Sequence, residues 1–512
     1  MGVWKGLSPR NWGLEDHERT LKNLFTFLAL SLLVLFSAKL AVGYIRSLPL
    51  LLPDEGDILI PAFFHLEKGI GYPFQKYPPF PFMLYETMLW VFSWFLPLKT
   101  SNLFLAGRLI NLGLCSANIL LLFVAARDWM EDRWALLAAF FFAFCPLTLL
   151  SYAFVKTESL LVAEILVALW AGFRVMKNPE SAIYNGVCAL AAATAAATNF
   201  NPMPAVIWLA FASMGLSQSG MRLRRIPWGL AVGPGTRWFA PLCFLFLFFL
   251  FLPAWEALKD FSLEEFRQDC HALSAPTLFR ATESFLAFPY GRIAFPFTFL
   301  LPFALGPLHY LLTLAALGLR AVPPKWAASW MIACAVYLAL HIAVIVPLGF
   351  SFLIPFVPVA SVAPVFLLKR TRKILGRGVF VLVLLLMGLS LYQSPALIGM
   401  VGNLQMNLKK IPEDCKRLVS HCDTANQGWD PNAPSEDILT DLPTHLFYSD
   451  SYGSSFCKAG NDKECRFFRN LTGPDSPYTV QWVSRTQYPW KWLAVRINPE
   501  ASFNFYLLER KE

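Results

Sequence analysis

Residues 21–45 read LKNLFTFLALSLLVLFSAKLAVGYI, and an acidic stretch, PDEGD, follows at residues 53–57. A helix needs about 20 mainly apolar residues to cross the roughly 30 Å hydrocarbon core of a bilayer, so the first stretch is long enough. The residues ahead of it include Trp4, Trp12 and Glu15 and lack a small-residue cleavage site. We therefore expect this run to be retained as a first transmembrane helix and not to be removed as a signal peptide.

The composition extends this interpretation to most of the chain. Of the 512 residues, 56% are hydrophobic and 15% are charged, whereas an average soluble protein has about 25% charged residues. The last 112 residues hold 27 of the charged residues, and the first 400 hold 50. These numbers exclude an ordinary soluble enzyme. They predict a membrane domain over residues 1–393 and a water-soluble domain over residues 394–512.

Further apolar runs of similar length follow the first one. They cover residues 103–126, 134–151, 158–175, 183–199, 203–217, 237–253, 293–319, 326–347, 350–368 and 377–393. The pattern predicts a polytopic α-helical membrane protein with about 11 to 13 transmembrane helices. Residues 79–98 are also apolar, and whether they cross the membrane decides on which side every later loop lies.

The basic residues indicate the orientation. The net charge of +9 comes from short loops between apolar runs, which points to membrane topology and not to a nucleic-acid partner. If residues 79–98 form a re-entrant or interfacial outer helix, these loops share one side with the basic N-terminal segment, as the positive-inside rule requires. The loop residues are Arg127, Arg133, Arg174, Lys177, Arg222, Arg224, Arg225, Arg320, Lys325, Lys369, Arg370, Arg372 and Lys373. We therefore expect a cytoplasmic N-terminus, outer loops at residues 46–102 and 254–292, and an extracytoplasmic C-terminal domain, in a bacterial inner membrane rather than the endoplasmic reticulum.

Residues 394–512 have the pattern of a mixed α/β domain. It predicts a helix over residues 397–409 and strands over residues 444–449, 478–484, 492–497 and 503–509. Four cysteines in this domain indicate two disulfides in an oxidising compartment, with free thiols as the alternative. They are Cys415, Cys422, Cys457 and Cys465, and all three pairings are open.

Acidic residues beside a membrane helix are the strongest sign of chemistry. Asp54 and Glu55 are costly at that place unless they meet cations or water, and a carboxylate there can act as a general base toward an acceptor hydroxyl. The alternative is a hydrated loop in which Asp57 caps a helix over residues 58–67. Glu158 begins a later apolar run on the same outer face, where the helix dipole alone would also favour an acid.

Three basic residues are candidates for binding a phosphate. Lys76 precedes a proline-stiffened turn, Arg108 lies near the outer end of its run, and Arg292 lies in the second long outer loop. Each has an ordinary alternative, which is snorkelling or headgroup contact for Lys76 and Arg292 and structural ion pairing for Arg108. No set of metal ligands is visible, so no cofactor is predicted, and a divalent cation is left open.

These elements together resemble the GT-C class of membrane glycosyltransferases. Within it the sequence is most similar to the protein O-mannosyltransferase superfamily, especially the bacterial aminoarabinose transferases that modify lipid A. The matching stretches are Pro53-Asp54-Glu55, Lys76-Tyr77-Pro78-Pro79, Ala106-Gly107-Arg108-Leu109, DRWALLA at 132–138, Lys156-Thr157-Glu158-Ser159 and FLIPFVP at 352–358. The resemblance covers most of residues 20–370.

The resemblance implies transfer of a sugar from a polyprenyl-phosphate donor to a lipid, glycan or protein acceptor on the outer face of the membrane. Carried over to this chain, Asp54 would be the base, Glu55 its acidic neighbour, Glu158 the second acid, and Lys76 the partner of the donor phosphate. A single displacement with these groups would invert the anomeric centre. We expect Arg108 and Arg292 to assist in binding the phosphate.

Three departures from the family leave the sugar and the acceptor open. Glu158 replaces a frequent aspartate, Asn199 replaces a lysine, and Phe352 replaces a tyrosine. The resemblance therefore does not separate a hexosyl from a pentosyl transferase. One alternative function is a transporter or flippase for a lipid-linked substrate, which would carry midplane charges and repeated interrupted helices. The other is a non-catalytic membrane scaffold whose C-terminal domain binds a partner.

Overall fold

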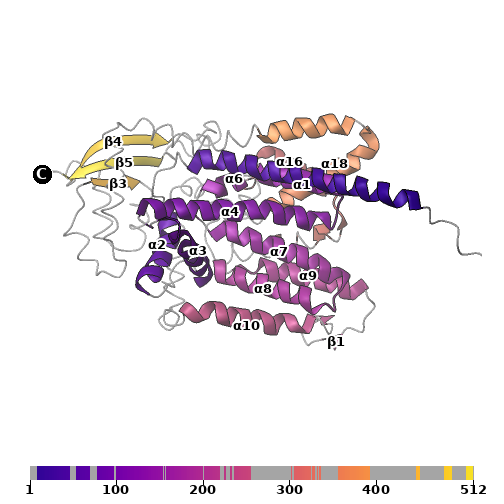
Figure 1. Cartoon of the computed structure of the whole chain (residues 1–512), viewed down its shortest axis with the longest axis horizontal. Coiled ribbons are helices and arrows are strands. Elements are labelled where there is room, and N and C mark those ends of the chain that lie inside the picture. Colours follow the sequence, from indigo (N-terminus) through magenta and orange to yellow (C-terminus); the bar gives the residue numbers. More distant parts are fainter. Residues whose placement is uncertain are drawn as a thin grey trace, which may run out of the picture.

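The structure is a computed structural model in which helices form an elongated bundle with a small β-sheet at one end (Figure 1). It describes residues 9–45, 53–69, 78–96, 98, 100–153, 155, 157–199, 201–218, 224–225, 231–232, 236–254, 301, 305–324, 326–328, 331, 334–335, 356–376, 378–391, 445–449, 478–486 and 503–510. The helices are α1 (Pro9–Ile45), α2 (Pro53–Lys68), α3 (Pro79–Ser93), α4 (Thr100–Arg127), α5 (Asp132–Ala143), α6 (Pro146–Ala153), α7 (Thr157–Lys177), α8 (Ala182–Asn199), α9 (Met203–Gln218), α10 (Phe239–Phe251), α16 (Pro307–Gly318) and α18 (Val357–Leu375).

Four helical segments in the described part are long and apolar enough to cross a membrane. They are Asn23–Val42, Leu105–Arg127, Thr157–Lys177 and Thr236–Ala254. Shorter apolar helices cover Met203–Gly215, Pro307–Gly318 and Gly378–Leu391. The chain is thus a polytopic helical membrane protein, and the total of about 11 to 13 spans stays a prediction.

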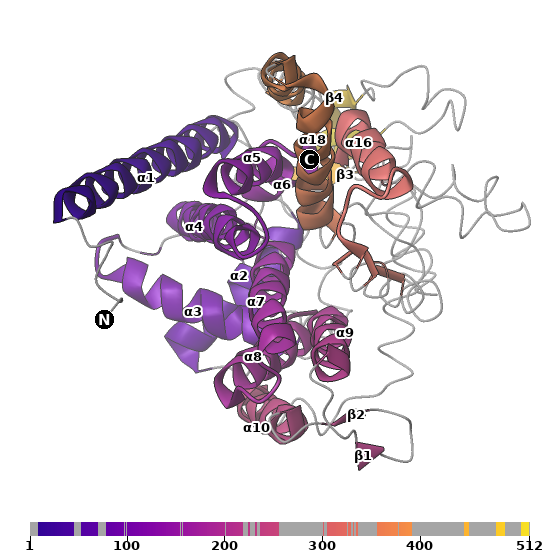
Figure 2. The same cartoon turned by 90° about the vertical axis from the view of Figure 1, so that its right-hand side faces the viewer.

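Helix α7 lies inside the bundle, next to α4, α8 and α9 (Figure 2). Helix α8 contributes small side chains to the packing, because Ala189, Ala193 and Ala195 are fully buried. Small residues allow membrane helices to approach each other closely, which gains dispersion energy that lipid contacts do not supply. On the α9 side, a Cβ atom at Gly172 would come 2.8 Å from Phe211. The two faces of α7 therefore fit their neighbours tightly.

The apolar run at residues 134–151 forms two helices and not one continuous helix, and its crossing of the membrane as one span stays a prediction. Helix α5 ends at Ala143 and α6 begins at Pro146. A proline disfavours helical geometry at the residue before it and has no N–H group to continue the ladder, so the chain bends at Cys145. The bend places the last turn of α6 beside α4, where Ser151 accepts a hydrogen bond from Asn111.

The region expected as an outer loop over residues 46–102 contains two helices. Helix α2 begins at Pro53, so Asp54, Glu55 and Asp57 lie in its first turns; the expectation of a loop ending in an Asp57 cap is wrong. Proline is favoured at a first helical position, and acids near a helix N-terminus are stabilised by the dipole.

Helix α3 packs beside α2 and matches the apolar run expected over residues 79–98. Its 15 residues extend about 22 Å, which is too short to cross about 30 Å of hydrocarbon. The two helices are joined by His65 Nδ1 and Glu86 Oε1 at 2.9 Å. A short helix at this place agrees with an interfacial segment, and its side of the membrane stays a prediction.

Several basic segments come together at one end of the bundle. Arg174 at the end of α7 makes two hydrogen bonds, of 2.7 and 2.9 Å, with Asp128 beyond the end of α4. Trp129 in the same turn contacts Trp326, with 5.1 Å between ring centroids. Arg370 near the end of α18 donates to the Leu319 carbonyl after α16. This common end is what the positive-inside rule requires of cytoplasmic loops.

The opposite end carries an antiparallel sheet of three strands in the order β3-β5-β4 (Figure 1). They are β3 (His445–Ser449), β4 (Tyr478–Thr486) and β5 (Phe503–Arg510), close to three of the strands that alternation of apolar and polar residues predicts. The two-residue strands β1 (Arg224–Arg225) and β2 (Ala231–Val232) pair separately. The helix expected over residues 397–409, the strand expected over residues 492–497 and the four domain cysteines lie outside the described residues.

Candidate functional site

One apolar cluster joins the segments that carry the expected acids. It contains Ile58 and Leu59 of α2, Ala106 and Ile110 of α4, and Val155 just before α7. The backbone of Asp54 and Glu55 lies one helical turn before Ile58, and Glu158 lies three residues after Val155. The structure thus brings the start of α2, the N-terminal part of α4 and the start of α7 to one place, although they are distant in sequence.

The contact between α2 and α4 is close at Gly107. A Cβ atom at this glycine would lie 2.5 Å from Leu59 Cδ1 and 2.7 Å from Cδ2. Only a hydrogen atom fits there, so α2 packs against the backbone of α4. The next residue, Arg108, is 4% exposed. A buried cation therefore directly follows the glycine at which α2 contacts α4.

Glu158 lies in the first turn of α7 and is 7% exposed. The residue after it is held by α4 through two contacts. Asn118 Nδ2 donates to the Ser159 carbonyl at 2.8 Å, and Cys115 Sγ donates to Ser159 Oγ at 3.3 Å. These bonds fix the turn of α7 that carries Glu158.

A polar stripe along α4 was missed by the sequence interpretation. Asn111, Cys115 and Asn118 are spaced by four and three residues, so they share one helix face, and they contact Ser151 of α6 and Ser159 of α7. Two asparagines inside an otherwise apolar run were the available signal, because amides in a membrane helix usually bond to another helix.

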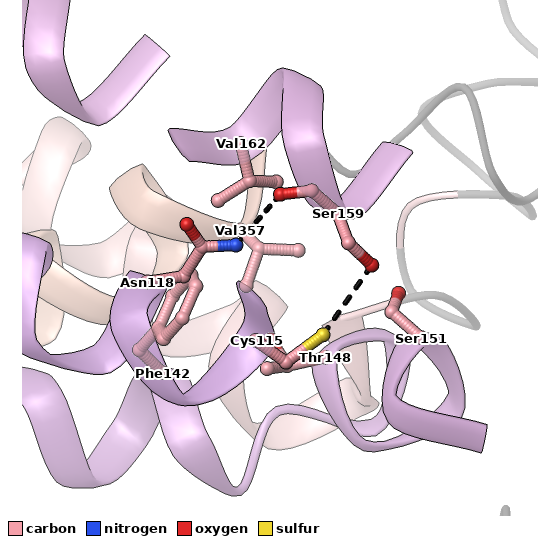
Figure 3. A pocket seen from close by; sticks show the side chains of 8 residues that line it. All are labelled: Cys115, Asn118, Phe142, Thr148, Ser151, Ser159, Val162 and Val357. Atoms are coloured by element: carbon pink, nitrogen blue, oxygen red, sulfur yellow. Dashed lines mark hydrogen bonds between the residues drawn. The ribbon is translucent and has the colours of Figure 1, made fainter. Parts of the chain in front are cut away.

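The stripe borders a small pocket between α4, α5, α6, α7 and α18 (Figure 3). Its lining residues are Cys115, Asn118, Phe142, Thr148, Ser151, Ser159, Val162 and Val357. Figure 3 shows the two bonds from Asn118 and Cys115 to Ser159 along one wall. The pocket therefore reaches the residue next to Glu158.

The second acid of α7, Glu164, belongs to a different contact. It is 5% exposed, and its Oε1 accepts a 2.6 Å hydrogen bond from Thr198 of α8. Six residues correspond to about 600° of helix rotation, so Glu164 and Glu158 point in different directions. The hydrogen bond assigns Glu164 to the α7–α8 interface.

Two of the expected phosphate-binding residues, Lys76 and Arg292, lie outside the described residues, and so do the side chains of Asp54 and Glu55. Within the described part of the chain, no group of three or more His, Cys, Asp or Glu side chains is arranged to hold a metal ion. We therefore define the candidate site by where its residues lie on their helices. These residues are Asp54 and Glu55 of α2, Arg108 of α4 and Glu158 of α7.

Comparison with known proteins finds structural neighbours only. The chain matches no family model and no curated protein. Among solved structures, it is similar to ArnT from Cupriavidus metallidurans bound to undecaprenyl phosphate, with 14% identity, a TM-score of 0.45, and coverage of 88% of this chain and 82% of that chain. The apo state of the same protein gives 16% identity and a TM-score of 0.42, over 74% of this chain and 72% of that chain.

A third similar structure is the Archaeoglobus fulgidus oligosaccharyltransferase in complex with Zn and sulfate. It has 12% identity and a TM-score of 0.40, and the match covers 71% of this chain and 52% of that chain. The first two structures are of an aminoarabinose transferase, the group that the sequence motifs resemble.

Proposed function

We propose that this membrane protein is a glycosyltransferase that moves a hexose or pentose from a polyprenyl-phosphate donor to an acceptor on the extracytoplasmic side. The acceptor is a lipid, a glycan or a protein. The proposal combines the acidic start of α2, the buried Arg108 and the buried Glu158 with the motifs quoted above. It also takes the end of the bundle with the three-stranded sheet as the outer side.

The observation that carries the proposal is the shared apolar cluster. Ile58, Ala106 and Val155 lie in it together, so the helix turns bearing Asp54, Arg108 and Glu158 are neighbours. Charged residues that are buried in a membrane protein gather where they have partners or a polar substrate. Two acids and a cation from three separate helices therefore favour a built site over three unrelated surface charges.

The residue types suit a single displacement. Asp54 takes the proton of the acceptor hydroxyl while its oxygen forms a bond to the anomeric carbon, and Glu55 and Glu158 orient the reacting groups. The bond from the anomeric carbon to the phosphate oxygen breaks at the same time, and its electrons stay on the departing lipid phosphate. Lys76, Arg108 and Arg292 stabilise that negative charge. Attack opposite to the leaving group inverts the anomeric centre.

Purified protein in lipid vesicles, supplied with labelled polyprenyl-phosphate sugars and extracted lipid, glycan or peptide acceptors, tests the activity. We expect transfer by the wild type and at least about 100-fold slower transfer by Asp54→Asn, the scale of a lost general base. Full transfer by this variant would remove the role of Asp54, and product with a retained anomeric centre would exclude the single displacement.

A control variant separates lost chemistry from lost folding. Glu67→Gln changes an exposed carboxylate near the end of the same helix, so we expect transfer close to that of the wild type. Absence of transfer by the wild type from every donor, with donor lipid still moving between leaflets, would favour a flippase instead. A labelling experiment tests which end of the bundle faces outward. Cysteines are introduced at position 178, beside the end of α7, and at position 447 in β3. An impermeant thiol reagent is then applied to intact and to opened vesicles.

A further inference from the structure

We propose that Asn118 is a positioning residue for Glu158. This inference rests on the proposed function, because it takes Glu158 as an acid of the transfer site. Asn118 is 2% exposed and lies on α4, whereas Glu158 lies on α7. The amide therefore acts across a helix interface.

The amide nitrogen of Asn118 controls the rotation of the first turn of α7. It donates to the Ser159 carbonyl at 2.8 Å, and the Ser159 hydroxyl accepts from Cys115 at 3.3 Å. Two atoms of one residue are thus bound by one neighbouring helix, so this turn cannot rotate without breaking both bonds. Because Glu158 directly precedes Ser159, its direction is set by the same contacts.

The pocket beside these contacts is closed by Val357 at the start of α18. A helix far along the chain therefore packs next to the residues that hold Ser159.

The kinetic test uses full-length protein and the transfer assay described above. Asn118→Leu keeps the branched shape and the number of heavy atoms and removes both hydrogen-bonding groups, and we expect kcat to fall by about 10- to 100-fold, as for other residues that orient a catalytic group. The KM for the donor should stay unchanged, because donor binding does not require Ser159. Asn118→Gln retains an amide donor and should recover part of the lost kcat.

A matched control is available at Asn185, another fully buried asparagine. It donates to the carbonyls of Pro179 and Ser181 and accepts from Trp208, far from Glu158 in the chain. Asn185→Leu should lower the unfolding temperature without changing kcat. If Asn118→Leu keeps its kcat, or if Asn185→Leu loses as much, the positioning role is refuted.

Density maps of the wild type and of Asn118→Leu provide a test without activity. We expect a displaced Glu158 carboxylate in Asn118→Leu, and an unmoved Glu158 overturns the positioning role. If the wild type transfers no sugar, the proposed function fails while these maps still decide the inference.

Discussion

Replacing Gly107 by alanine tests whether α2 is held directly against α4. The new Cβ atom would lie 2.5 Å from Leu59 Cδ1, whereas carbon atoms in contact are about 3.5–4.0 Å apart. Leu59 is fully buried, so it must either leave its rotamer or move with α2 by about 1 Å. Overpacking of this kind costs about 1–3 kcal/mol of unfolding free energy. A displacement of 1 Å at catalytic groups lowers a rate about 100-fold.

The assay combines unfolding in detergent with the rate of sugar transfer. Gly113→Ala on the same helix is the control, because its Cβ would meet no heavy atom within 4 Å, and we expect neither property to fall. Leu59→Ala alone should cost about 2–5 kcal/mol. In the double variant the alanine at Gly107 fills part of that cavity, so its destabilisation should be smaller than the sum by about 0.5–3 kcal/mol.

Equal unfolding free energies for Gly107→Ala and Gly113→Ala would show that α2 does not pack against α4 at this glycine. Additivity in the double variant would lead to the same conclusion. A loss of stability with unchanged transfer would retain the packing but refute the link between the position of α2 and the chemistry. The three outcomes therefore separate the structural claim from the functional one.

Glu158→Gln should slow transfer by at least about 100-fold, whereas Glu164→Gln on the same helix should leave transfer unchanged, because Glu164 faces α8; equal rates for the two variants would contradict this division. Thr198→Val removes the hydroxyl that donates to Glu164 and should cost about 1–3 kcal/mol of unfolding free energy; an unchanged unfolding midpoint would argue against the bond. Asp128→Asn weakens the pair with Arg174, which is 38% exposed, and should cost at most about 1 kcal/mol. High salt should reduce this last difference, and a salt-independent loss would indicate another cause.

The long apolar runs predicted helices well because a membrane span has a simple signal. The runs expected at residues 21–45 and 158–175 correspond to helices ending at Ile45 and Lys177. Continuous hydrophobicity over about 20 residues reports the environment of a helix directly. It requires no knowledge of which helices are neighbours.

Three features of the fold were harder to predict from the sequence, because they depend on local chemistry or on contacts between distant residues. The break before Pro146 was readable from the proline itself, but the apolar run around it concealed the break. The helical start at Pro53 was hidden by the acids that follow, which also suit a loop. Asn118 could be identified in the sequence as a buried amide, but its bond to Ser159 arises only after α4 and α7 have packed.

For the candidate site, too, the sequence predicted some features and not others. The motifs predicted that Asp54, Arg108 and Glu158 belong together, and the structure brings their helix turns around one apolar cluster. The reaction assigned to them stays a prediction, since sequence patterns contain no distances between reacting atoms. The contributions of Lys76 and Arg292 also stay predictions.

The alanine-rich face of α8 has a consequence for how much of the protein is inserted into the membrane. Helix α8 is not among the described segments that are apolar enough to cross a membrane by themselves, since alanine gains little from lipid. Its stability in the bilayer therefore depends on α7, α9 and α10, which pack around it. Larger residues at Ala193 should consequently lower the amount of protein inserted, even where the few molecules that mature have normal activity.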